Sequence, residues 1–241
     1  MKVSSTSFIH YTPKIETVKS ILEQGFNVYY CLEEIYSPGI IRHIGIPMVS
    51  FCDIPLIHVA ANNYGNHAFG MNRSWGIRQH LLPVSYYPNN KECLSTMVVK
   101  KASEAYIKDK TKTEDFEVLG YSKPMYKLQS LSKGKSNNNY IEREWRKVYA
   151  PNSSYRWKSE SEYNEYRGNK DTPKKEIGKP LRFDAKDIDF ILVPDIDVPN
   201  IISSIKSLKY LGGDTSKKLS DSDKDLLLAK ILSYDNLIKN L

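Results

Sequence analysis

Residues 140–149 have the sequence YIEREWRKVY, in which charged side chains are interleaved with large apolar ones. Successive side chains of a β-strand point to opposite faces of its sheet, so a strand here places Glu142, Glu144 and Arg146 on one face. Neighbouring carboxylates repel each other, and burial raises the pKa of a carboxyl group unless cations or hydrogen-bond donors compensate. We therefore predict a strand that contributes to a polar site, in which Arg146 compensates the two acids. The alternative is an exposed, charged strand with a local ion pair.

A second polar side chain interrupts an apolar stretch near the start of the chain, where residues 8–12 read FIHYT. We predict a strand over 7–11, followed by a helix that Thr12 caps, Pro13 begins and Gly25 ends. His10 then lies where the strand meets the helix. This position suits a ligand-binding histidine, and equally a structural histidine with one satisfied nitrogen.

The rest of the sequence alternates irregularly between expected strands and helices. Strands are expected over 44–54, 67–71, 83–87 and 188–193, and polar loops over 130–139 and 152–180. A long helix after residue 93 is expected, with Leu94, Met97, Val98, Ala102 and Ala105 on one side. Because regular strand–helix–strand repeats are missing, the order predicts an α+β fold with a mixed or antiparallel sheet.

Two amphipathic helices are expected at the C-terminal end of the sequence. The apolar residues of the first are Ile201, Ile202, Ile205 and Leu208, and those of the second are Leu226, Leu227, Ile231, Tyr234 and Ile238. Helices with one apolar face pack that face against a core. We therefore predict a core domain over residues 1–195 and a C-terminal helical cap over 196–241.

The composition limits the classes of protein that fit. The chain has 241 residues, 40% of them hydrophobic, which is enough for one substantial core. No apolar run approaches the roughly 20 residues that cross a bilayer, and we expect a cytoplasmic protein with no membrane partner. Its three cysteines, Cys31, Cys52 and Cys93, form no CxxC pair, so neither a disulfide framework nor a zinc site is indicated. The formal net charge of +7 favours an anionic partner such as nucleic acid or a nucleotide.

Several motifs together resemble a known family. They are FIHYT at 8–12, IPMVSFCDIPL at 46–56, NYGNHAFGMNRSWG at 63–76 and EREWR at 142–146. Over roughly residues 8–149 the sequence resembles the AbiGi abortive phage-resistance family, which is usually described as the antitoxin side of a two-gene system. The resemblance implies a part in bacterial phage defence.

A more distant likeness bears on chemistry. A histidine at the end of a first strand, Ser-Phe in a second and Glu-x-Glu in a later one are similar to ADP-ribosyltransferases of the DarT type. This resemblance implies a split sheet that binds NAD as substrate, with Glu144 as the catalytic residue and Glu142 as its activating neighbour. It places His10 and Ser50 at the NAD, and an aromatic ring such as Phe51 or Tyr64 can stack on the nicotinamide. The candidate NAD-binding residues are thus His10, Tyr11, Thr12, Ser50, Phe51, Tyr64 and Arg146. A carboxylate there stabilises the positive charge that develops on the ribose when the nicotinamide bond breaks.

Three functions therefore remain open. The first is a defence enzyme that transfers ADP-ribose to a protein or nucleic-acid acceptor, or that hydrolyses NAD. The second is a non-catalytic antitoxin or regulator that binds a partner toxin. The third is a nucleic-acid-binding module. The enzymatic interpretation expects His10 and the Glu142–Glu144 pair to line one ligand-sized hollow.

Overall fold

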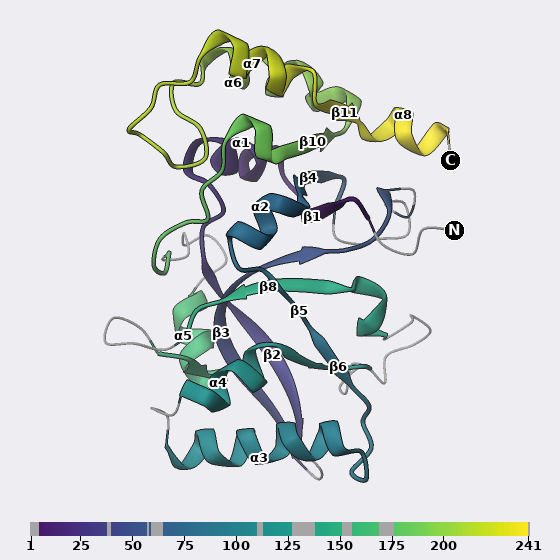
Figure 1. The fold of residues 1–241 in the computed structure, drawn as a ribbon, viewed down its shortest axis with the longest axis vertical. Helices are drawn as coiled ribbons and strands as arrows, with labels where there is room; N and C mark the ends of the chain where they lie inside the picture. The colour runs from purple at the N-terminus through teal and green to yellow at the C-terminus, as the bar shows by residue number, and fades with distance from the viewer. Residues whose placement is uncertain are drawn as a thin grey trace. The chain divides into compact units, whose positions relative to one another are not determined.

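The computed structural model describes residues 5–37, 40–56, 58, 65–109, 113–126, 138–150, 156–168 and 176–240. Contacts divide the chain into two units (Figure 1): a first unit, Met1–Asn27 with Ser50–Leu81 and Lys179–Leu241, and a second unit, Val28–Val49 with Leu82–Gly178. Both units contain strands and helices, which confirms the predicted α+β class. The predicted domain boundary after residue 195 does not coincide with a boundary of either unit.

The first unit is built on a mixed sheet. Its strands, in spatial order, are β11 (Ile231–Ser233), β10 (Ile188–Val193), β4 (His67–Asn72), β1 (Ser7–Thr12) and the last residues of β3 (Ile40–Cys52). β1 pairs antiparallel with β4, and β10 pairs parallel with β11, so the predicted mixed sheet is confirmed. β4 has five buried residues in a row because it lies in the interior of the sheet, where both faces are covered.

Five α-helices of the first unit are described: α1 (Ile15–Gln24), α2 (Arg73–Arg78), α6 (Val198–Ser207), α7 (Asp221–Leu228) and α8 (Tyr234–Lys239). The predicted start of α1 is wrong, because Thr12 is the last residue of β1, where it pairs with His67, and Lys14 is the N-cap. The predicted end is confirmed. Gly25 has a φ of 81° and donates its N–H to the carbonyl of Ile21.

The C-terminal segment differs from the predicted pair of helices. The expected second helix is divided into α7, β11 and α8, and β11 extends the sheet by pairing Ile231 with Ile191. Ser220 and Asp223 form a capping box that begins α7. Residues 196–241 therefore contribute a strand as well as helices.

The second unit has its own strand arrangement. β2 (Tyr29–Ser37) forms a hairpin with β3, β3 also pairs with β8 (Glu144–Val148) and β9 (Lys158–Ser159), and β8 pairs with β5 (Leu82–Pro83). A separate two-stranded sheet joins β6 (Ser85–Tyr87) and β7 (Ser122–Pro124). β3 links the units, because its residues up to Val49 belong to the second unit and those from Ser50 to the first.

The described α-helices of the second unit are α3 (Leu94–Lys108), α4 (Thr113–Gly120) and α5 (Glu160–Arg167). The apolar side predicted for α3 is buried only in part. Ala102 is buried in the core, but Leu94, Met97 and Val98 are exposed, and Val99 and Tyr106 pack on the core together with Ala102.

The predicted loop over 152–180 is also wrong for its described part. It contains β9 and α5, and it buries the aromatic side chains of Trp157 and Tyr163. The expected loop over 130–139 falls mostly outside the described residues.

Candidate functional site

The predicted strand over 140–149 is only partly correct. Residues Asn139–Glu142 form a 3-10 helix, Arg143 has a left-handed φ of 42°, and the strand β8 begins at Glu144. Glu142 therefore does not share a strand face with Glu144. The left-handed turn at Arg143 nevertheless leaves both carboxylates beside the same ammonium group, that of Lys123.

Arg146 holds Glu144 through two nitrogens. Its side chain is completely buried, with Nε 2.6 Å from Oε1 of Glu144 and Nη2 2.9 Å from Oε2. This side-on pairing has the bidentate geometry in which guanidinium–carboxylate contacts are strongest. The predicted compensation of Glu144 by Arg146 is confirmed, and the alternative of an exposed strand with a local ion pair is wrong.

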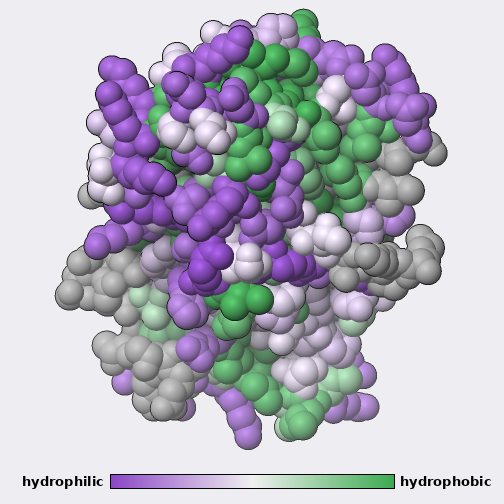
Figure 2. Space-filling model, turned by 45° about the horizontal axis from the view of Figure 1, so that its top comes forward, coloured by the Kyte–Doolittle hydropathy of each residue, from purple (hydrophilic) through white to green (hydrophobic). Residues whose placement is uncertain are grey.

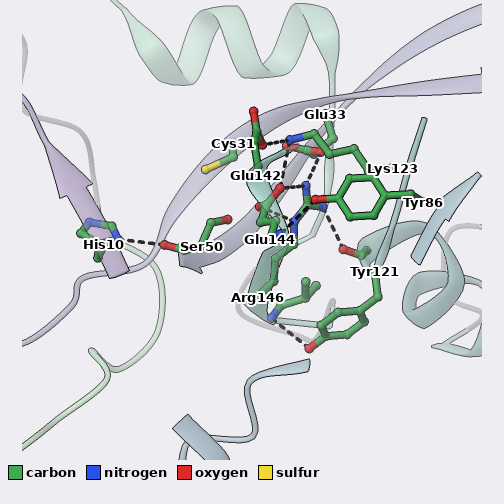
Figure 3. A network of polar contacts seen from close by, with 12 residues as sticks. His10, Cys31, Glu33, Ser50, Tyr86, Tyr121, Lys123, Glu142, Glu144 and Arg146 are labelled. Carbon is green, nitrogen blue, oxygen red and sulfur yellow. Dashed lines mark hydrogen bonds and ion pairs between the residues drawn. The ribbon is translucent and has the colours of Figure 1, made fainter. Parts of the chain in front are cut away.

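Three further groups complete a charge cluster in the second unit (Figure 3). Lys123 on β7 lies 2.8 Å from Oε2 of Glu142 and 2.9 Å from Oε2 of Glu144. Glu33 on β2 accepts a hydrogen bond of 2.6 Å from Nη2 of Arg146. The charge cluster thus consists of Glu33, Lys123, Glu142, Glu144 and Arg146, and it joins β2, β7 and β8 with the 3-10 helix.

Electrostatics keeps both cations of the charge cluster protonated. Burial alone lowers the pKa of Lys123, but the carboxylates of Glu33 and Glu144 outweigh that effect and raise the pKa above its ordinary value. The pKa of Arg146 is likewise raised, because Glu144 and Glu33 outweigh the cost of burial. Both groups remain charged at physiological pH.

Two tyrosines lie beside the charge cluster. The hydroxyl oxygen of Tyr86 accepts the N–H of Glu144 at 2.9 Å, and that of Tyr121 accepts the N–H of Val148 at 3.1 Å. Burial raises the pKa of Tyr86 above its ordinary value, so its hydroxyl stays neutral. Sequence reasoning missed both tyrosines, and also Glu33 and Lys123, because each comes from a separate element without a shared motif.

The structure brings three other predicted residues together in the first unit, His10, Ser50 and Phe51. Nδ1 of His10 lies 2.9 Å from the backbone oxygen of Ser50 (Figure 3). The His10 ring also contacts the rings of Phe26 and Phe51. Burial lowers the pKa of His10, and the Ser50 hydrogen bond opposes this only in part. The ring is therefore neutral at pH 7, with its Nδ1 proton donated to the carbonyl.

Phe51 is 1% exposed and also packs on Phe26 and Trp75, so this group lies in an aromatic core. Of the remaining predicted residues, Thr12 is buried in β1. Tyr11 is half-buried in β1, and Tyr64 lies outside the described residues. His10, Tyr11, Thr12, Ser50 and Phe51 belong to the first unit, whereas Glu142, Glu144 and Arg146 belong to the second. The expectation that the two sets share one ligand stays a prediction.

Within the part of the chain that the structure describes, no group of three or more His, Cys, Asp or Glu side chains is placed to hold a metal ion. None of the described helices has the length and apolar character needed to cross a membrane.

Comparison with known proteins gives the family. The profile of the AbiGi abortive phage resistance proteins, whose description adds the word antitoxin, matches residues 24–194. The chain belongs to the AbiGi family. It is similar to the abortive phage resistance protein AbiGi of Lactococcus lactis subsp. cremoris, with 27% identity over 227 aligned residues. The match covers 80% of this chain and 87% of the relative. No solved structure is significantly similar to this chain.

The AbiGi match covers the charge cluster, since Glu33, Lys123, Glu142, Glu144 and Arg146 all lie between residues 24 and 194. The resemblance found in the motifs is therefore confirmed at the level of the family. The match names a role in phage resistance and does not name a reaction.

Proposed function

We propose that this AbiGi protein is the antitoxin of a phage-defence pair and that it acts by binding its toxin rather than by catalysis. The antitoxin description of the matched family supports the first part. The bonding of Glu144 supports the second, because Arg146 and Lys123 together engage both of its carboxylate oxygens. A carboxylate held by two cations is a weak base, and it has little capacity left to stabilise a cationic transition state.

The charge cluster then has a structural task in the antitoxin. It fastens the strand β8 to β2 and β7, and Arg146 also donates to the carbonyl of Gly120 at 3.1 Å. Such a buried network specifies how elements pack when all its members are satisfied. A rigid second unit would present a fixed surface to a toxin.

The test is co-expression with the product of the neighbouring gene, together with titration of the two purified proteins. We expect the wild-type chain to bind that product and restore growth, and Glu144→Gln to do both wherever circular dichroism shows it folded. Loss of rescue by a folded Glu144→Gln protein would contradict the non-catalytic role.

An NAD-dependent transferase is the second candidate, and one observation favours it. Glu142 and Glu144, the acids that the ADP-ribosyltransferase likeness assigns to catalysis, both contact Lys123, so they form a close pair. In this candidate function Glu144 stabilises the charge on the ribose and Glu142 orients the acceptor.

This second function is tested with NAD carrying a label on its ADP-ribose. Wild-type protein should transfer label to a macromolecule or release free ADP-ribose, and Glu144→Gln should stop both under conditions where circular dichroism shows the variant folded. Lys206→Gln, a change on the exposed side of α6, serves as a control that should leave turnover intact. No turnover by the wild-type protein, with or without the neighbouring gene product, would remove this candidate.

A further inference from the structure

The second unit has an open groove that the charge cluster does not explain. It has a volume of about 660 Å³ and lies between the N-terminal half of α3, the end of α4 and the strands β5 to β7. The apolar residues along it include Leu82, Tyr87, Leu94, Val98 and Val118. Three of these are unusually exposed, with Leu94 at 75%, Leu82 at 49% and Val98 at 45%. Large exposed apolar groups that gather around a groove are typical of an interaction surface.

The charges around the groove indicate what it binds. Among the described residues that line it, Glu117 alone is charged, and this side chain is exposed and has no ion pair within the described part of the chain. Nucleic-acid surfaces are lined by lysine and arginine, and none of the described lining residues is of either type. The groove therefore suits an apolar peptide segment that carries one basic side chain.

The geometry of α3 indicates the form of that segment. Leu94 and Val98 are four residues apart and form a ridge along one side of the groove. Rows of residues at this spacing pack against the grooves of a second helix. Figure 2 shows that hydrophobic residues are exposed among hydrophilic ones at the surface of the chain.

We propose that this groove binds an amphipathic helix of the partner toxin, with its apolar face on Leu82, Leu94 and Val98 and a lysine or arginine beside Glu117. The assignment rests on the proposed antitoxin function and names the surface that carries it out. Helix-in-groove recognition of this kind uses apolar anchors at i, i+4 and i+7.

α3 provides a matched control for the test. Met97 and Val98 are adjacent and almost equally exposed, at 44% and 45%, but Met97 lines a different hollow, with Lys100 and Glu104. Val98→Glu and Leu94→Glu should each weaken binding of the purified neighbouring gene product by about tenfold or more, because an apolar anchor becomes charged. Met97→Glu should change the affinity by no more than about twofold. Glu117→Lys should also weaken binding, through repulsion of the basic side chain.

The possible outcomes distinguish failure of the groove proposal from failure of the antitoxin proposal. Wild-type protein that neither binds the neighbouring gene product nor restores growth overturns both proposals. If the wild-type protein binds but Val98→Glu and Leu94→Glu leave binding intact, only the groove proposal is overturned. The same holds if Met97→Glu weakens binding as much as those two variants do.

A photo-crosslinking residue at position 98 gives a second measurement that does not depend on folding of the charged variants. The crosslink should map to a helical segment of the purified toxin, with apolar residues at helical spacing. Crosslinks to a second copy of this chain, or a complex with a short DNA duplex that Val98→Glu abolishes, would assign the groove to another occupant and overturn the proposal.

Discussion

Arg146 is one of the two cations of the charge cluster in the second unit, the other being Lys123. Arg146 is a fully buried cation between Glu33 and Glu144, two carboxylates that are themselves 13% and 7% exposed. Forming such a cluster is costly because each ion loses its hydration, whereas removing one partner leaves the others buried without compensation. The first consequence to test is therefore the loss of this one cation.

Arg146→Met should lower the free energy of unfolding by about 3–5 kcal/mol, since methionine keeps most of the volume but none of the charge. Arg156→Met is the control, because Arg156 forms an exposed ion pair with Glu162 and its loss should cost about 1 kcal/mol or less. Urea unfolding monitored by tryptophan fluorescence measures both. Equal losses in the two variants would mean that the charge cluster contributes nothing beyond a surface ion pair.

His10 should make stability depend on pH. Its pKa in the folded protein is lowered by burial, whereas the unfolded chain has the ordinary value of 6.5. Between these two values the unfolded state binds more protons, so the stability that His10 contributes is present above about pH 6.5 and is lost as the pH falls toward the folded pKa.

The measurement is the free energy of unfolding at pH 7.5 and at pH 5 for the wild type and for His10→Gln. The variant should lose less stability between the two pH values, because glutamine does not titrate. An identical loss in both proteins would contradict a lowered pKa of His10, and the comparison cancels the contributions of the other histidines.

At the scale of elements, α3 illustrates what periodicity leaves open. The predicted apolar side holds Leu94, Met97, Val98, Ala102 and Ala105, whereas the residues that pack on the core are Val99, Ala102 and Tyr106. Val99 and Tyr106 are buried because Phe116 and Trp157 offer a packing surface there, and the ring of Tyr106 contacts that of Phe116 edge-on and that of Trp157 at a tilt. The partner elements, rather than the helix alone, decided which side faces inward.

The end of α1 allows a test of backbone geometry. Gly25 and Gly178 both have positive φ, at 81° and 68°, but a Cβ at Gly25 would lie 2.7 Å from the carbonyl oxygen of Leu181, whereas at Gly178 the nearest atom is 3.5 Å away. Gly178→Ala should cost about 1–2 kcal/mol of conformational strain. Gly25→Ala should cost clearly more, because backbone atoms must move apart.

Thermal and urea unfolding of the two alanine variants measure the difference. If Gly25→Ala is no more destabilising than Gly178→Ala, the close approach of residues 25 and 181 does not matter, and only the sign of φ does.

For the molecule as a whole, binding through the net charge and binding through the apolar groove should depend on salt to different degrees. A chain of formal charge +7 should bind a short DNA duplex weakly at low salt through phosphate contacts. Log affinity should then fall by about 0.9 for each tenfold rise in salt and each neutralised phosphate. Binding of the toxin in an apolar groove with one charge should change little over the same range.

Isothermal titration at 50 and 200 mM salt, concentrations over which phosphate-based binding changes strongly, compares the two ligands. A toxin affinity that falls as steeply as the DNA affinity would show that the basic surface, and not the groove, drives recognition.

Local pattern predicted a good part of the fold. The strand over 188–193, the stop at Gly25 and the pairing of Glu144 with Arg146 were all predicted from residues within a few positions of each other, and all are confirmed. The errors lie where a local rule competes with a distant partner. Glu142 lies outside the expected strand because the chain makes a left-handed turn at Arg143. The segment over 152–180 was expected to be a loop because it is rich in lysine and polar residues, but its Trp157 and Tyr163 side chains are buried.

Residue types at short, fixed spacing were enough to predict the α+β class, the acids at 142 and 144 with their arginine, and membership of the AbiGi family. What those acids contact depends instead on distant residues that only the folded chain brings together. Glu33 reaches Arg146 across 113 positions of sequence, and Lys123 reaches Glu144 across 21. Whether a carboxylate is held in a salt bridge depends on neighbours brought together by the packing of strands, and that packing minimises a free energy summed over the whole chain.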